Sequence, residues 1–183
     1  MVAYPFSQPP TDHRVRLDGE REVFAMCAID ALGVPFMLGV AAEIVSCDPV
    51  TGDEVWVRVE PGEGQWWEPE QALVLAGSVP GPGPSSGTCC RFVNFFSSRD
   101  SAERYLADRP SLAGGILTIP DAAAAGRIVF GELPAVLREL AADVGARWIL
   151  GSAVFKRWRI GPDMTGGVLV LDEYGRPSGG QSR

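Results

Sequence analysis

Residues 24–32 read Phe-Ala-Met-Cys-Ala-Ile-Asp-Ala-Leu, an apolar run that contains one thiol, Cys27, and one carboxylate, Asp30. Side chains three positions apart lie on the same face of a helix, so a helical run places these two groups side by side. A carboxylate is costly to bury unless it has a partner or a chemical role. We therefore expect this run to pack inside the fold and to hold a candidate functional site.

The segments around this run predict an α+β fold, in which a mainly antiparallel sheet is packed by several helices. Residues 21–33 are apolar on most sides and predict a buried helix that ends at Gly33, with Pro35 shortly after. Residues 55–59 alternate between valines and larger polar or aromatic side chains, which is the period of a half-buried strand. Further strands are expected near residues 13, 41, 72, 90, 115 and 168.

Turn and capping signals predict the remaining elements. Asp100 with Glu103 three residues later favours a helix through Leu106, because this pair is a variant of the capping box. Further helices are expected after Pro120 and after Pro134. The Pro- and Gly-rich residues 79–87 predict a loop, which leads directly to Cys89-Cys90 and a strand.

We divide the chain of 183 residues into four parts by composition. Residues 1–12 are proline-rich and polar and are expected to form a flexible arm. Residues 13–134 form the core domain, and residues 135–174 are a C-terminal extension expected to pack on it. Residues 175–183 are rich in Gly and Ser and are predicted to be disordered.

Charge and composition exclude several classes of function. The formal net charge of −7 argues against a nucleic-acid or anionic-membrane partner. No stretch is apolar enough for a membrane span, and the first residues lack the pattern of a signal peptide. We therefore expect a cytoplasmic protein whose four cysteines stay reduced and serve in metal binding, catalysis or packing. The single histidine, His13, makes a Ser/His/Asp triad or a histidine-rich zinc site improbable.

The cysteines suggest a site for a soft metal. In an extended segment Cys89 and Cys90 point to opposite faces, so only one of them meets Cys27 readily. Two converging thiolates select soft ions such as Zn(II), Cu(I) or Hg(II). The sequence has no Cys-x-x-Cys spacing, which argues against a zinc ribbon or a thioredoxin-type redox pair.

Structural roles for the same residues remain open at this point. Free cysteine packs like a small apolar side chain, and Cys47, at the end of an expected strand, is best explained in this way. Asp30 alone is also explained as a helix cap or as the partner of an arginine such as Arg91 or Arg127.

At these residues the sequence resembles the organomercurial (alkylmercury) lyase family. The resemblance is carried by residues 24–35 and by residues 89–96, which read Cys-Cys-Arg-Phe-Val-Asn-Phe-Phe. Cys47 before Thr51-Gly52 and the region 101–130 also look similar to the family. The resemblance covers residues 13 to about 134, so the core domain is expected to be alkylmercury-lyase-like. Relative to the family, the N-terminal region is shortened and the C-terminal part is extended.

The resemblance implies that Cys27, Cys89 and Asp30 are catalytic. It also implies that Cys27 and Cys89 bind the metal, with Asp30 as a further candidate ligand, that Cys47 is structural and that Cys90 is not catalytic. One thiolate attacks mercury in R–Hg–X, and the carboxylate takes a thiol proton and gives it to carbon. The hydrocarbon R–H leaves, and Hg(II) stays on two sulfurs. The family implies a small organomercurial substrate, a role in mercury resistance, no organic cofactor, and a thiol-bearing acceptor for the metal.

Two other functions remain open alongside this lyase. In the first, the same sulfurs bind Cu, Zn or Hg(II) for transfer or sensing without lyase chemistry. In the second, a relative of the family acts on an organosulfur or other natural-product substrate through the same thiols. The extension 135–174 is expected to pack on the core, to bind a partner, or to join a second copy of the chain as a homodimer.

Overall fold

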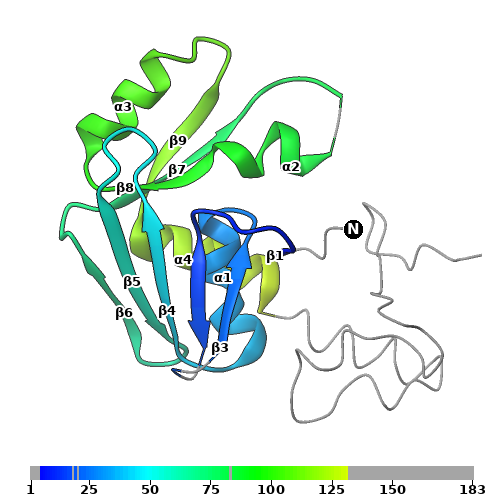
Figure 1. Cartoon of the computed structure of the whole chain (residues 1–183), viewed down its shortest axis with the longest axis vertical. Coiled ribbons are helices and arrows are strands. Elements are labelled where there is room, and N and C mark those ends of the chain that lie inside the picture. Colours follow the sequence, from blue (N-terminus) through cyan, green and yellow to red (C-terminus); the bar gives the residue numbers. More distant parts are fainter. Residues whose placement is uncertain (1–4, 18, 20, 83, 132–183) are drawn as a thin grey trace, which may run out of the picture. The chain divides into compact units, whose positions relative to one another are not determined.

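The computed structural model describes residues 5–17, 19, 21–82 and 84–131, and all of them belong to one compact unit that spans Val2–Leu133. The helix expected after Pro134, the strand near residue 168, the extension 135–174 and the tail 175–183 lie outside the described residues. The described part contains helices and two antiparallel sheets, which confirms the predicted α+β class (Figure 1).

The larger sheet has six strands in the order β1-β3-β2-β4-β5-β6, and all neighbours are antiparallel. Its strands are β1 (Phe6–Ser7), β2 (Arg14–Leu17), β3 (Arg21–Ala25), β4 (Ala42–Cys47), β5 (Glu54–Glu60) and β6 (Gly64–Glu68). The predicted alternation in β5 is confirmed: Val55, Val57 and Val59 are buried, whereas Trp56 and Arg58 face outward. β1 lies within the segment expected to be a flexible arm and pairs with β3.

The smaller sheet has three strands, with β7 (Leu73–Ser78) between β8 (Val93–Phe96) and β9 (Ala113–Thr118). The sequence predicted a single sheet, and this prediction is wrong. Alternation shows which face of a strand is buried but not which strand lies beside it, so the division into two sheets leaves no mark in the pattern. The smaller sheet packs with helix α3 (Arg99–Ala107) in a core of its own, formed by Leu73, Leu75, Phe96, Ala102, Tyr105 and Leu112.

Helix α1 (Ala28–Leu38) is the central element of the described unit. It contacts strands of both sheets and packs against helix α4 (Ile119–Phe130), as the two adjacent ribbons in Figure 1 illustrate. The helices approach closely because glycines face each other: a Cβ on Gly126 would lie 2.8 Å from the backbone nitrogen of Gly33. A helix enclosed in this way has to be apolar on nearly every side, as the sequence of α1 is.

The predicted helix over residues 21–33 is wrong at both ends. Its first part is β3, which pairs with β2 in a hairpin, so sheet pairing overrides the helical appearance of these residues. Its last part continues through Gly33 and Pro35 to Leu38. The helix ends where Gly39 adopts the left-handed conformation, with a φ of 67°, and donates its N–H to the Pro35 carbonyl at 2.8 Å.

The chain before β8 is more helical than predicted. The expected loop at residues 79–87 runs into a short helix, α2 (Ser85–Thr88). Cys89 and Cys90 are not extended, because a 3₁₀ turn, η1 (Cys90–Phe92), follows at once. The Phe92 N–H donates to the Cys89 carbonyl at 2.8 Å and closes this turn, so the strand begins only at Val93.

The helices predicted from Asp100 and after Pro120 are present as α3 and α4. The cap of α3 differs from the prediction, since the hydroxyl of Ser98 accepts from the Ser101 N–H and takes the capping role given to Asp100. In the part of the chain that the structure describes, no helix has the length and apolar character required to span a membrane.

Candidate functional site

Cys27 is the N-cap of α1, directly after the end of β3. Its backbone is extended, and its Sγ accepts a hydrogen bond from the Asp30 N–H at 3.4 Å. The sulfur therefore occupies the helix N-terminus, where the backbone dipole favours negative charge. The Asp30 side chain lies beside it, so the neighbourhood of thiol and carboxylate predicted from their spacing is present.

Cys90 completes a cluster with these two residues. The Sγ atoms of Cys27 and Cys90 and a carboxylate oxygen of Asp30 all lie within 4.8 Å of one another. The three residues are 4%, 6% and 1% exposed, respectively, so the cluster is buried. Among the described residues, this is the one group of three Cys, His, Asp or Glu side chains close enough to share a metal ion.

Cys89 does not belong to the cluster, although the resemblance placed a catalytic thiol there. It precedes η1 and is half-buried. Of the vicinal pair, Cys90 is the residue whose sulfur the turn brings to Cys27, and sequence reasoning missed it. The only hint of Cys90 in the sequence was the Cys89-Cys90 pair, because two adjacent cysteines do not reveal which of them faces the interior. Cys47 is half-buried at the end of β4 and is also outside the cluster.

The turn that carries Cys90 is held close to the smaller sheet. Gly77 on β7 permits this approach, because a Cβ at that position would lie 2.8 Å from the Phe92 carbonyl oxygen. The Asn94 side chain also donates to the Arg91 carbonyl at 3.2 Å and braces the end of the turn. The position of Cys90 is thus fixed by backbone packing far from it in sequence.

The two clustered thiols are electrostatically linked. A hydrogen bond between their side chains raises the pKa of Cys27 and lowers that of Cys90, since a thiolate on one sulfur is stabilised by the proton on the other. Burial and the charge of Asp30 raise the pKa of Cys27 further. The pair therefore gives up its first proton more readily than its second.

The thiol of Cys89 has a raised pKa, and burial is the largest cause. The negative charges of Cys90 and Asp30 add to the same effect. Cys89 is thus within electrostatic range of the cluster even though its sulfur is not part of it.

The cluster has the chemistry of a soft-metal site with an acid or base beside it. Thiolates are the preferred ligands of soft ions, and a buried carboxylate next to them is able to take up and return a proton. Both thiols come from positions with a defined backbone, an N-cap and a 3₁₀ turn. Little rearrangement is therefore needed for the two sulfurs to bind one ion.

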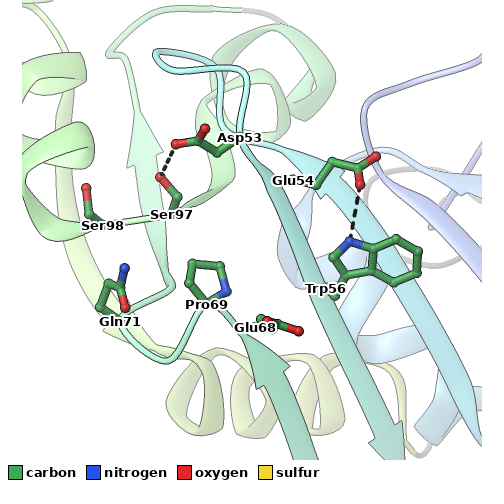
Figure 2. Close-up of a pocket in the computed structure, with 8 residues that line it drawn as sticks. All are labelled: Asp53, Glu54, Trp56, Glu68, Pro69, Gln71, Ser97 and Ser98. Carbon is green, nitrogen blue, oxygen red and sulfur yellow. Dashed lines mark hydrogen bonds between the residues drawn. The ribbon is translucent and has the colours of Figure 1, made fainter.

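A pocket on another part of the described unit has a different character. Figure 2 shows its lining, which consists of Asp53, Glu54, Trp56, Glu68, Pro69, Gln71, Ser97 and Ser98. The Ser97 hydroxyl donates to Asp53 at 3.2 Å, and the Trp56 indole donates to Glu54 at 3.3 Å. None of the four cysteines lines this pocket, so the candidate site is the thiol cluster.

Comparison with known proteins places these residues in a family. The model of the alkylmercury lyase family matches residues 6–131. The alkylmercury lyase of Staphylococcus epidermidis is 32% identical over 127 residues, 69% of this chain and 57% of that protein. The alkylmercury lyase of Streptomyces lividans is 31% identical over 121 residues, 66% of this chain and 55% of that protein.

A solved structure agrees with the sequence comparison. The crystal structure of the mercury-bound form of MerB2 superimposes with a TM-score of 0.59 and 30% identity, over 68% of this chain and 60% of that one. The chain thus spans little more than half the length of the curated relatives that it matches. The matched region, residues 6–131, contains both sheets and every residue of the thiol cluster, so the chain belongs to the alkylmercury lyase family.

Proposed function

We propose that the protein is a lyase that cleaves the carbon–mercury bond of small organomercurials. The observation that carries the proposal is the burial of two thiols and one carboxylate within 4.8 Å of one another, in a chain of the alkylmercury lyase family. The thiols supply the ligands that mercury prefers, and the carboxylate supplies a positioned general acid. We assign the catalytic roles to Cys27, Asp30 and Cys90, the three residues of this cluster, so Cys90 takes the place of the Cys89 that the resemblance suggested.

The proposed reaction has two stages that balance. A first thiol, Cys90, displaces X from R–Hg–X and forms R–Hg–S, and its proton leaves with X. The thiol of Cys27 then passes its proton to the Asp30 carboxylate and attacks mercury. The protonated Asp30 delivers this proton to carbon, and the electron pair of the carbon–mercury bond becomes the new C–H bond. The products are R–H and Hg(II) on two sulfurs, with Asp30 again ionised.

The burial of the cluster supports this assignment. A carboxylate that is 1% exposed exchanges protons with adjacent groups more readily than with bulk water, and the Cys27 sulfur lies within 4.8 Å of a carboxylate oxygen of Asp30 as an adjacent proton source. A sulfur at a helix N-terminus is also favoured as a thiolate once the proton has left. The arrangement therefore suits a reaction in which one proton moves from sulfur to carbon.

The test is release of the hydrocarbon by the purified full-length chain. Incubation with phenylmercury acetate should yield benzene, measured by gas chromatography. The Cys27→Ser variant should release none, because serine is a poor ligand for a soft metal. The matched control is Cys47→Ser, which removes a thiol outside the cluster and should leave the rate unchanged.

Two results would contradict the proposal. Benzene release by Cys27→Ser at the rate of the unmodified chain would exclude this site. Binding of Hg(II) without release of any hydrocarbon would instead favour the second candidate function, a soft-metal-binding protein that uses the same cluster.

A further inference from the structure

Strand β6 is an open edge of the larger sheet. It is last in the strand order, so within the part of the chain that the structure describes its outer edge has no neighbouring strand (Figure 1). Proteins protect such edges with very short strands, lysines, prolines or bulges. The opposite edge is protected in this way, because β1 has only two residues. β6 has five residues and contains no Lys, Arg or Pro, so its edge is able to pair with a further strand.

The middle of this edge carries a large apolar side chain that faces solvent. Trp66 is 57% exposed and lies opposite Arg58 of β5. Trp56, two positions from Arg58 and therefore on the same face of the sheet, is 38% exposed. This face is opposite to the one on which the valines of β5 are buried. Covering the two indoles would remove apolar surface from water, which is the main driving force for association between proteins.

The sequence of β6, Gly64-Gln65-Trp66-Trp67-Glu68, is complementary to itself in one antiparallel register. When two copies pair about a two-fold axis at Trp66, all five residues take part. Trp66 then lies opposite Trp66 of the second copy, and Glu68 lies opposite Gly64 of the second copy. Aromatic residues directly opposite each other stabilise a pair of strands, whereas like charges in that position destabilise it. This register provides the aromatic pair and keeps the two carboxylates apart.

The neighbouring registers are less favourable. A shift of two residues in one direction brings Pro69 into the ladder, where it has no N–H to donate. A shift in the other direction pairs only residues 64–66 of each β6 with one another. The register centred on Trp66 is therefore the one that uses the whole strand.

We propose that β6 is the interface of a homodimer, in which β6 of a second copy of this chain pairs antiparallel with it and continues the larger sheet. The same strand serves both copies, so the interface is closed and does not lead to fibres. No residue of β6 belongs to the thiol cluster, so the inference is independent of the proposed function. The interface is small and each copy has a net charge of −7, so the dimer is reversible and weak.

The first test measures the oligomeric state of the full-length chain by sedimentation velocity. The unmodified chain should change from monomer to dimer between about 1 µM and about 500 µM, as expected of a small interface. Trp66→Glu should raise the dissociation constant at least about 10-fold, because the aromatic pair is lost and two carboxylates come to lie opposite each other. Within one chain the same change is tolerated, since the new carboxylate lies opposite Arg58.

The matched control is Ile128→Glu, which introduces the same charge at an exposed apolar residue of α4. It should leave the dissociation constant of the dimer unchanged. Two results would overturn the inference: an unmodified chain that stays monomeric over the whole concentration range, or a Trp66→Glu variant that dimerises as strongly as Ile128→Glu.

The second test locates the interface by cross-linking. Residues directly opposite in an antiparallel pair have Cα atoms about 4.5–5.5 Å apart, which is within the range of a disulfide. Trp66→Cys treated with diamide should therefore form a disulfide between the two copies of residue 66. The two thiols give up two electrons and two protons, which diamide takes up. The linked peptides are identified by mass spectrometry without reduction.

Trp56→Cys is the control for the cross-link. In the proposed register its two copies are separated by three strand spacings, at least about 14 Å, so they should not be joined. Equal cross-linking of the two variants, or covalent dimers joined only through the four native cysteines, would contradict the inference. Folding of all variants is checked by circular dichroism. Should Trp66→Glu fail to fold, the comparison of Trp66→Cys with Trp56→Cys decides.

Discussion

The carboxylate of Asp30 should be required for delivering a proton to carbon but not for retaining the metal. The Asp30→Asn variant keeps the size of the side chain but cannot return a proton to carbon. General acid catalysis contributes roughly 100- to 10,000-fold, so hydrocarbon release should fall by at least about 100-fold. Retention of Hg(II) against glutathione should stay close to that of the unmodified chain, because both sulfurs remain.

The matched control for this variant is Asp100→Asn, which makes the same change at an exposed position in the first turn of α3. It should leave both hydrocarbon release and metal retention unchanged. An Asp30→Asn variant that releases the hydrocarbon at the normal rate would show that the proton reaches carbon from another group.

His13 is a buried titratable residue whose ionisation should govern stability in mild acid. Its Nδ1 lies 2.9 Å from the Ser46 hydroxyl, and its ring packs edge-on against Phe95 with the centroids 5.9 Å apart. Burial lowers the pKa of His13 to about 4, so the folded chain keeps the ring neutral. The unfolded chain takes up a proton near the ordinary value of about 6.5.

The stabilising contribution of neutral His13 is therefore fully present above about pH 6.5 and is lost as the pH falls toward 4. His13→Asn keeps a polar atom near Ser46 but removes this titration. The difference in unfolding free energy between the unmodified chain and the variant should narrow by about 2 kcal/mol from about pH 7.5 to about pH 5. Urea unfolding measures it, and a difference independent of pH would contradict the assignment.

Only the part of the site that is formed by residues close together in the sequence could be predicted. Cys27 and Asp30 are neighbours because they are three positions apart at a helix start, which sequence spacing reveals. The choice between Cys89 and Cys90 depends on the rotation of η1, and this is set by backbone packing against Gly77 on another strand. Such a contact has no periodic signature, so the residue pair was visible in the sequence but its orientation was not.

At the scale of elements, the crossing of α1 and α4 positions the site, because α1 carries Cys27 and Asp30 at its N-terminal end. A Cβ added at Gly126 would lie 2.8 Å from the Gly33 nitrogen and 2.9 Å from the Ile29 carbonyl oxygen. Both are backbone atoms, so Gly126→Ala must push the helices apart. Overpacking costs about 1–3 kcal/mol, against a gain of up to about 1 kcal/mol from helix propensity.

We therefore expect Gly126→Ala to lower the unfolding free energy by roughly 1–2 kcal/mol, measured by urea unfolding. Gly115→Ala on β9 is the matched control, because a Cβ there meets no atom within 4 Å. It should leave stability unchanged or slightly increased. A Gly126→Ala variant as stable as this control would show that the helices tolerate a wider separation.

The elements that the sequence predicted well are those with one buried face. β5 falls within a residue or so of its predicted position because its valines alternate with exposed side chains. β4 was also found within a residue or so, although three consecutive residues of it are buried, because it is a short apolar segment that ends at a turn. β6 was missed because it lies at the sheet edge and has no fully buried position to create a pattern. β3 was taken for helix because its apolar residues continue directly into α1, and only pairing with β2 distinguishes them.

At the scale of the whole described unit, Asp48 joins the two sheets. It follows β4, and its Oδ2 accepts hydrogen bonds from the backbone N–H and the hydroxyl of Ser97, at 2.8 Å and 3.0 Å, just after β8. Its Oδ1 accepts from the Ser101 hydroxyl of α3 at 2.8 Å. Because β8 directly follows the turn that carries Cys90, this network also anchors one half of the thiol cluster.

Asp48→Asn should destabilise the chain substantially. The amide replaces one acceptor oxygen with an NH₂ donor, which leaves the N–H of either Ser97 or Val50 without its acceptor, depending on which oxygen is replaced. Loss of hydrogen bonds to a buried charged group predicts a decrease in unfolding free energy of about 2–4 kcal/mol at neutral pH. The control is Asp53→Asn, an exposed acceptor for the same Ser97 hydroxyl at 3.2 Å, which should cost less than about 1 kcal/mol.

The pH dependence of this difference identifies the charge as its cause. Burial alone would raise the pKa of Asp48, but hydrogen bonds from the N–H groups of Val50 and Ser97 and from the hydroxyls of Ser101 and Ser97 outweigh it and lower the pKa below its ordinary value. A carboxylate with a lowered pKa stabilises the fold above its unfolded pKa, and this contribution is lost as the pH falls through its folded pKa. The difference between the unmodified chain and Asp48→Asn should therefore stay constant from about pH 7 to about pH 5 and shrink below about pH 4. A difference that persists undiminished in acid would show that Asp48 joins the sheets through its shape rather than its charge.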